Sequence, residues 1–268
     1  MARSLLDAVA RGLRVYDLAQ PLHQGIPCSP NHPGFRFALQ RRHGDRVRAD
    51  GGSAASEVIV TGGHVGTHVD ALAHVSQDGL LHDGVAASEA QLGGRFSRHG
   101  TDELPLIVAR GLLLDVVPDG AGRLPPAFPI GPDELSAAGG LDLRPGDVAL
   151  IRTGWAQLWD DPTAFLSHDD GVPGVTEAGA RWLVSRGIQA TGADTTAYEH
   201  IPAGQGHALL PAHRVLLVEA GVPIVEMLDL EALARDGIRE CCFVLAALPI
   251  VGGTGSPVRP LALVDDAS

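Results

Sequence analysis

The sequence predicts a single α/β domain with a mixed β-sheet that spans residues 1–268. Segments with strand and helix patterns alternate in the second half of the chain, whereas the first half is mostly strand and loop. That order is typical of a sheet with helices packed on it. No internal repeat, low-complexity tract or linker divides the chain, and 268 residues are ample for one sizeable core.

The strands follow from runs of apolar, β-prone residues bounded by turn residues. The expected strands are 14–22, 56–61, 111–117, 147–153, 188–193, 222–227, 241–249 and 257–264. Helices are expected where apolar residues recur at helical spacing between a capping residue and a glycine. They are a short N-terminal amphipathic helix, a short helix from Pro132, a helix after Thr176 that stops at Gly187, and helices over 211–220 and 230–235.

Composition narrows the class of protein. Hydrophobic residues make up 45% of the chain and charged residues 19%, as in an ordinary soluble globular protein. The net charge of −12 argues against a phosphate-binding surface, so nucleic acid is not an expected partner. No apolar run reaches the roughly 20 residues of a membrane span. The N-terminal apolar stripe is interrupted by Asp7 and Arg11, unlike a signal peptide. The odd count of three cysteines is no disulfide framework and suits a reducing, cytoplasmic setting.

The most informative stretch runs from His64 to His74 and reads HVGTHVDALAH. Three histidines and one aspartate fall within these eleven residues. Imidazole nitrogens and carboxylate oxygens are the ligand set of a divalent cation such as zinc or manganese. The stretch therefore predicts a metal site.

Geometry requires a bend inside this motif. On a straight strand His64 and Asp70 would lie roughly 20 Å apart, because a strand rises about 3.3 Å per residue. Metal–ligand bonds of about 2.0–2.2 Å do not allow that separation. Gly66 is the residue that permits a bend. We expect a strand that ends before the bend and a helical turn after it, which stacks Asp70 and His74 at i, i+4.

The motif resembles the signature of the cyclase family of metal-dependent hydrolases, which includes bacterial kynurenine formamidases and isatin hydrolases. The family pattern H-x-G-T-H-x-D-x-x-x-H is matched at every fixed position. Weaker matches extend over nearly the whole chain, among them the segments VYDL at 15–18, GADT at 192–195, PIVE at 223–226 and GSPVRP at 255–260. The resemblance implies a swivelling β/β/α fold, a small-molecule substrate and a homodimer or homotetramer.

The resemblance also implies residue roles. His64, His68 and Asp70 would hold one Zn²⁺ or Mn²⁺, and His74 would carry a proton outside the metal's ligand shell. His213 and Glu226, with Asp70 as a bridge, would hold a second ion. Each chain would thus hold one or two ions.

The second ligand pair has one extra residue. His213 and Glu226 are thirteen residues apart, against twelve in the formamidase pattern. His207 and Glu219 have the twelve-residue spacing but lack the PIVE strand, so His213 and Glu226 are preferred. If His213 is a ligand, a helix distortion or a longer turn near 219–221 must absorb the extra residue.

Substrate-binding candidates are fewer. Asp194 ends an expected strand, a usual position for functional groups in α/β sheets, although it could equally cap a turn. Trp155 and Tyr198 are candidate aromatic walls for a planar substrate; for Trp155 a place in the core is the stronger expectation.

These patterns predict a metal-dependent hydrolase of an amide-type C–N bond in a small, aromatic substrate. By resemblance, N-formylkynurenine is the first candidate and a cyclic amide such as isatin the second. The alternatives are a polyketide-type cyclase, in which the same ions polarise a carbonyl, and a protein that binds metal or a small acid without turnover.

Overall fold

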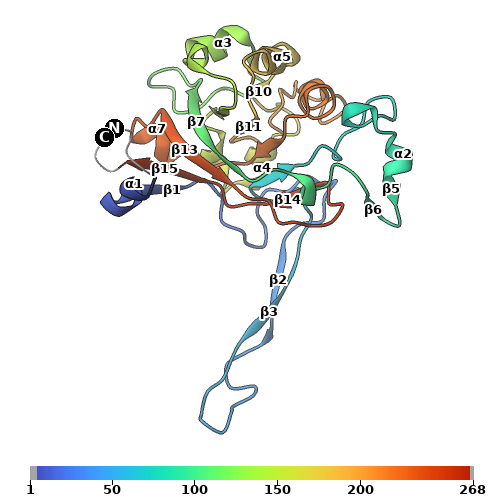
Figure 1. Ribbon diagram of the computed structural model, residues 1–268, viewed down its shortest axis with the longest axis vertical. Helices are drawn as coiled ribbons and strands as arrows, with labels where there is room; N and C mark the ends of the chain where they lie inside the picture. Colours follow the sequence, from blue (N-terminus) through green and yellow to red (C-terminus); the bar gives the residue numbers. More distant parts are fainter. Residues whose placement is uncertain (1–4, 266–268) are drawn as a thin grey trace.

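A computed structural model describes residues 5–265 of the chain and has a nine-stranded sheet at its centre (Figure 1). The sheet order is β1-β15-β13-β7-β9-β11-β12-β4-β14. Its four central strands, β7, β9, β11 and β12, run parallel, and the pairs on either side of them are antiparallel. The expected single α/β domain with a mixed sheet is confirmed.

The strands of this sheet are short, and most lie close to their expected positions. They are β1 (Leu13–Asp17), β4 (His68–Asp70), β7 (Ile107–Asp115), β9 (Val148–Arg152), β11 (Ala190–Ala193), β12 (Ile224–Glu226), β13 (Glu240–Leu245), β14 (Gly255–Pro257) and β15 (Leu261–Asp265). The expected strand 257–264 is wrong as one element, because the chain turns between β14 and β15, which lie far apart in the sheet. Three two-stranded sheets lie outside it: β2 (Arg36–Arg41) with β3 (Ser56–Val60), β5 (Gln91–Leu92) with β6 (Arg95–Phe96), and β8 (Pro129–Ile130) with β10 (Gly174–Val175).

The helices are also short. The α-helices are α1 (Leu5–Arg11), α2 (Ala87–Ala90), α3 (Pro132–Ala137), α4 (Pro162–Leu166), α5 (Glu177–Ser185), α6 (Pro211–His213) and α7 (Glu231–Arg235), and the 3₁₀ helices are η1 (His82–Gly84), η2 (Thr101–Glu103), η3 (Gly140–Asp142) and η4 (Trp155–Leu158). The segment η5 (Arg214–Ala220) is a π-helix that continues α6. Among the described residues, no helix has the length and hydrophobicity needed to cross a membrane.

Apolar side chains bury both faces of the central strands. Along β7, Leu112 and Leu114 belong to one core and Leu113 to the other, as the alternation of a strand requires. The first core is closed by α3, α5 and η5, and the second by α7. Thr176 caps α5 as expected, since its hydroxyl accepts the Gly179 N–H at 3.2 Å.

A β-hairpin, β2–β3, projects from this body as a long arm (Figure 1). Its base is closed by a hydrogen bond from the Gly62 N–H to the Pro33 carbonyl at 3.0 Å. The expected strand 56–61 is present as β3, but β2 was not foreseen and neither strand joins the main sheet. The arm thus lies between His32 and His64 in the chain.

Candidate metal centre

The strand β4 carries the centre of the motif into the main sheet, between β12 and β14. His68 and Asp70 lie two residues apart on it and so share a face. His68 is directly opposite Glu226 of β12 in the antiparallel register. The sheet therefore places these three side chains on one face, and all three are buried.

The bend occurs at Gly66, but it precedes the strand of the motif. Gly66 has φ +67°, and a Cβ there would lie 2.3 Å from Leu22 Cδ2. His64 consequently lies in a turn, and its Nδ1 is 2.7 Å from Asp70 Oδ1. The His64 ring also fits against Gly255, where a Cβ would meet it at 2.4 Å. The expected order of strand, bend and helix is wrong, because β4 needs the extended residues 68–70 to pair with both of its neighbours.

His74 reaches Asp70 through a turn and not through a helix. The His74 N–H bonds to the Ala71 carbonyl at 2.9 Å, and no helix is assigned over 70–74. Its Nε2 lies 3.9 Å from Asp70 Oδ2, and its ring stacks on that of His64 with centroids 3.9 Å apart. The predicted proximity of Asp70 and His74 is confirmed, although the local structure behind it differs.

His213 and Glu226 complete the cluster. His213 Nε2 lies 3.2 Å from Glu226 Oε1 and 3.6 Å from Asp70 Oδ2. The expected helix distortion is confirmed, because the chain widens into the π-helix η5 immediately after His213. The alternative pair is not brought together: Glu219 is held on the surface by Arg181 and Arg214, at 2.8 and 3.0 Å.

Four residues form a ring of alternating nitrogen and oxygen atoms. His68 Nε2 lies 3.4 Å from Glu226 Oε2 and 3.5 Å from Asp70 Oδ1, and His213 Nε2 faces the other oxygen of each carboxylate. Charge-assisted hydrogen bonds are shorter, about 2.7–2.9 Å. An ion with bonds of about 2.0–2.2 Å would place neighbouring tetrahedral or octahedral ligand atoms about 2.9–3.6 Å apart. The spacing of His68, Asp70 and Glu226 fits a shared cation, and His213 lies beside these three residues.

Two further observations support this fit. Asp70 Oδ2 is buried and has no hydrogen-bond partner among the described residues, which is costly for a carboxylate oxygen unless a cation satisfies it. Two sets of three residues that could each hold an ion share Asp70: one adds His68 and Glu226, the other His64 and His74. The grouping differs from the one that the family resemblance implied, which paired His64 with His68.

The carboxylates favour positive charge on the imidazoles. Burial alone would lower the pKa of His68, but hydrogen bonds to Asp70 and Glu226 outweigh it and raise the pKa to about 10. The pKa of His213 is also raised against the effect of burial, by Asp70, Glu199 and Glu226. A bound divalent cation would take the place of these protons. The negative charge of the carboxylates therefore favours a metal as it favours protonated imidazoles. His74 is the exception: burial lowers its pKa to about 4, which leaves its ring neutral.

Sequence reasoning missed Glu199, which orients His213. One oxygen of the buried Glu199 carboxylate accepts the Ala212 N–H at 2.7 Å, and the other accepts His213 Nδ1–H at 2.9 Å. Because a carboxylate only accepts, Nδ1 carries the proton and Nε2 is free to bind a metal. His68 is fixed in the same way by the Gly66 carbonyl, 2.8 Å from its Nδ1. An acidic residue twelve positions before a helix forms no motif, so the sequence offered no signal for Glu199.

A cavity of about 260 Å³ opens onto the cluster. It is lined by Ser29, Asn31, His32, His64, His68, His74, Thr196, Ala197, His207, Leu210, His213, Glu226 and Met227. His207, from the discarded pair, is thus a wall of the cavity. The walls before the motif and around 196–210 come from loops, which is why the sequence did not reveal them.

The three substrate-binding candidates do not line this cavity. Trp155 is in the core and donates its Nε1–H to the Phe165 carbonyl at 2.8 Å. The buried hydroxyl of Tyr198 lies 2.9 Å from Thr191 Oγ1. Asp194 accepts the N–H and hydroxyl of Thr153 and the N–H of Gly154, so it holds the turn after β9.

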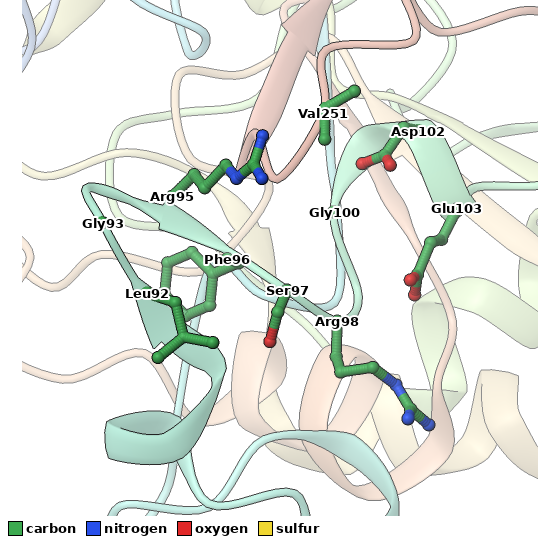
Figure 2. Close-up of a pocket in the computed structure, with 10 residues that line it drawn as sticks. All are labelled: Leu92, Gly93, Arg95, Phe96, Ser97, Arg98, Gly100, Asp102, Glu103 and Val251. Carbon is green, nitrogen blue, oxygen red and sulfur yellow. The ribbon is translucent and has the colours of Figure 1, made fainter.

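A larger cavity lies elsewhere, between the β5–β6 hairpin and the loop at Val251 (Figure 2). Its volume is about 590 Å³. The charged residues that line it are two arginines, Arg95 and Arg98, and two acids, Asp102 and Glu103. Asp102 already accepts the Gly252 N–H at 2.8 Å, and Glu103 accepts the His99 N–H at 2.7 Å. It has neither a histidine cluster nor a buried carboxylate among its lining residues.

Comparison with known proteins agrees with the motif. The sequence model of the family described as "Putative cyclase" matches residues 16–200, more than half of the chain. The chain belongs to the cyclase family. Its family relatives include the isatin hydrolase of Roseibium aggregatum, 28% identical over 82% of this chain and 78% of that protein. The kynurenine formamidase of Geobacillus thermodenitrificans is 26% identical over 91% of this chain and 94% of its own length.

The fold of the chain is also similar to that of a solved cyclase structure. A crystal structure described as a novel cyclase superposes with a TM-score of 0.82 at 26% identity, covering 97% of this chain and 93% of the other. A match of that extent includes the main sheet and therefore the strands that carry the cluster of this cyclase-family chain.

Proposed function

We propose that this protein is a metal-dependent hydrolase of an amide-type C–N bond in a small substrate. The observation that carries the proposal is the buried group of His68, Asp70 and Glu226, whose ligand atoms lie within 4.8 Å of one another as those of one cation would. His213 lies beside this group, with its Nε2 3.2 Å from Glu226 Oε1. Relatives named isatin hydrolase and kynurenine formamidase, with 25–28% identity, support amide hydrolysis as the reaction class. An N-formylated arylamine such as N-formylkynurenine is the first substrate proposed, and a cyclic amide such as isatin the second.

The residues divide the work between metal binding and proton transfer. Zn²⁺ or Mn²⁺ at this site would lower the pKa of a bound water from about 15.7 toward 7 and polarise the substrate carbonyl. Glu199 and the Gly66 carbonyl hold His213 and His68 with their Nε2 atoms toward the two carboxylates. His64 donates to Asp70 and fixes its orientation. His74, neutral and at the cavity wall, accepts a proton and returns it to the leaving nitrogen.

The cavity supports a small substrate. Its volume of about 260 Å³ is below the roughly 300–1,000 Å³ of typical ligand pockets. No Phe, Tyr or Trp is among its described lining residues, so the imidazoles of His32 and His207 are the flat groups available to an aromatic ring. Ser29, Asn31 and Thr196 provide polar contacts on the same walls. A cytoplasmic location remains part of the proposal and is supported by the unpaired state of Cys28, Cys241 and Cys242.

The test is to remove the metal and replace it, and to measure the hydrolysis of both substrates at each stage. Chelated protein, shown to be metal-free by elemental analysis, should hydrolyse neither N-formylkynurenine nor isatin, and Mn²⁺ or Zn²⁺ should restore hydrolysis of at least one. His68→Ala should fail to bind metal, whereas Glu219→Gln, on the surface of η5, should behave as the wild type. Full activity without metal would refute the proposal. Tight metal binding without turnover of these substrates or small lactams would instead identify a binding protein.

A further inference from the structure

Two histidines outside the cluster, His82 and His99, lie between the two segments that bring His74 and His213 to Asp70. His82 begins η1, and His99 lies in the loop before η2. Both are partly buried, and neither lines the cavity at the cluster. Metal binding and proton transfer as proposed above use neither of them. Their hydrogen bonds nevertheless reach both segments.

The position of His213 depends on more than the sheet. His68, Asp70 and Glu226 lie on the paired strands β4 and β12, whose register fixes them relative to one another. His213 lies on no strand, and it is followed at once by the π-helix η5. Its distance from Asp70 therefore depends on how η5 is held against the turn that follows β4.

His82 holds the C-terminal end of η5. The last C=O groups of a helix have no partner within it. In π-helical register the Val218 carbonyl would accept from the N–H of residue 223, which is Pro223 and has none. The Val222 N–H, the α-helical alternative, bonds instead to the Leu216 carbonyl at 2.8 Å. The Nδ1–H of His82 supplies the missing donor and bonds to the Val218 carbonyl at 2.9 Å.

Gly221 allows the His82 ring to approach this helix end. Gly221 has φ +66°, and a Cβ there would clash with the His82 ring. Glycine is the residue that accepts both the left-handed backbone and the close contact. The end of η5 is thus shaped around the imidazole of His82.

His99 connects His82 to the turn that follows β4. The Nε2–H of His99 donates to the His82 carbonyl at 3.1 Å. The His99 carbonyl in turn accepts the Ala73 N–H at 3.0 Å. Ala73 belongs to the turn through which His74 reaches Asp70. A continuous series of hydrogen bonds therefore runs from the end of η5 to this turn.

The backbone of His99 is strained. Its φ is +63°, in the left-handed region that is unfavourable for a residue with a side chain. Such a conformation persists only where the surrounding contacts hold it, and it is concentrated at functional sites. Here the His99 N–H is also bonded, to Glu103 Oε2 at 2.7 Å. The strain indicates that these contacts specify the position of His99.

We propose that His82 and His99 form a brace between η5 and the turn after β4, and that this brace holds His213 opposite Asp70. The two residues are positioning residues, since they act on the metal only through the segments that they join. The proposal rests on the metal site of the proposed function. It adds a determinant of metal affinity that lies outside the cluster and its cavity.

Amide substitutions that keep or remove one hydrogen bond test the brace. The amide nitrogen of asparagine takes the place of imidazole Nδ1, and that of glutamine the place of Nε2. His82 donates through Nδ1, so His82→Asn should keep its bond to Val218 and His82→Gln should lose it. His99 donates through Nε2, so His99→Gln should keep its bond and His99→Asn should lose it. Each pair is its own matched control.

The measurement is the affinity for Co²⁺, by competition with a chelator, together with the visible absorption of the bound Co²⁺. His82→Gln and His99→Asn should bind Co²⁺ about 10-fold more weakly, the lower end of the loss typical of residues that orient metal ligands, and with an altered spectrum. His82→Asn and His99→Gln should resemble the wild type. Because the two contacts act in series, the double variant His82→Gln/His99→Asn should bind about as weakly as the weaker single variant.

Three results would overturn the proposal. One is a folded His82→Gln protein, as judged by circular dichroism, with the Co²⁺ affinity and spectrum of the wild type. Another is equal weakening in His82→Asn and His82→Gln, which would assign His82 to packing alone. The third is a double variant whose loss is the product of the single losses, which would make the two histidines independent. A wild type that binds no Co²⁺, Mn²⁺ or Zn²⁺ would refute the proposed function and the brace together, so the two failures are distinguishable.

Discussion

Replacing Glu199 by glutamine tests whether the carboxylate behind His213 sets the affinity for metal. Its two oxygens serve three donors: the Ala212 N–H at 2.7 Å, the His213 N–H at 3.2 Å and the His213 Nδ1–H at 2.9 Å. Glutamine offers one oxygen and an NH₂ group. If the NH₂ faces His213, Nδ1 becomes the acceptor and the proton moves to Nε2, the atom that would bind metal.

The expected loss follows from that geometry. Removing a partner that orients a metal-binding histidine typically costs 10–100-fold in metal affinity, or about 1.4–2.7 kcal/mol. If the NH₂ faces the Ala212 N–H instead, a buried donor loses its acceptor, which costs about 1–3 kcal/mol of stability. Glu199→Gln should therefore bind metal 10–100-fold more weakly and also unfold at a lower temperature.

Competition with a chelator of known affinity measures the first effect, and thermal unfolding of metal-free protein measures the second. Glu219→Gln is the matched control, since Glu219 belongs to the same helical segment but is exposed and bonded to arginines. A folded Glu199→Gln protein with the metal affinity of the wild type would refute the argument. It would mean that packing alone orients His213.

Three other substitutions give separate answers. His74→Ala should keep its metal and lose about 10²–10⁴-fold in rate; loss of metal would make His74 a ligand, as its proximity to Asp70 also allows. Glu226→Gln should lower the metal content from two ions to one per chain if two are bound, or weaken binding of the single ion if one is bound; an unchanged metal content and affinity would show that Glu226 is not a ligand. Asp194→Asn should remove a pH dependence of stability: burial raises the pKa of Asp194 to about 6, so the folded state favours the protonated carboxyl. The stability that this group contributes is full below about pH 4 and lost as pH rises through 6, about 3 kcal/mol in all. Urea unfolding of metal-free protein from pH 4 to 7 should show this contribution as the difference in slope between the wild type and Asp194→Asn, because the shifted histidines of the cluster titrate in both proteins.

The sequence predicted the main sheet well because its central strands are buried on both faces. Such strands are nearly continuous apolar runs, as in β7 and β9. They can be recognised in the sequence without knowing which strands they pair with. The arm strand β2 was missed because every residue in it is exposed. Its alternation of Arg36, Phe37 and Ala38 indicates no single buried face.

The candidate metal cluster was predictable where its residues lie close together in the sequence, and not where the fold brings distant segments together. The motif from His64 to Asp70 needed only residue types and the freedom of Gly66. The turn before His74 was mistaken for a helix, since i, i+4 contacts arise from both. Glu199 depends on packing between two segments, and no pattern in the sequence records that contact. Trp155 and Tyr198 were candidate aromatic walls from residue type alone, with the core as the stronger expectation for Trp155, and the structure places both in the core.

The π-helix η5 has a consequence for how this chain is aligned with its relatives. The thirteen residues from His213 to Glu226 run through this π-helix and a short turn at 221–223 before β12, and a wider helical turn takes up a residue without lengthening the loop. Distance counted along the chain is therefore a poor guide to shared ancestry of this pair, and matching the flanking strand β12 is a better one.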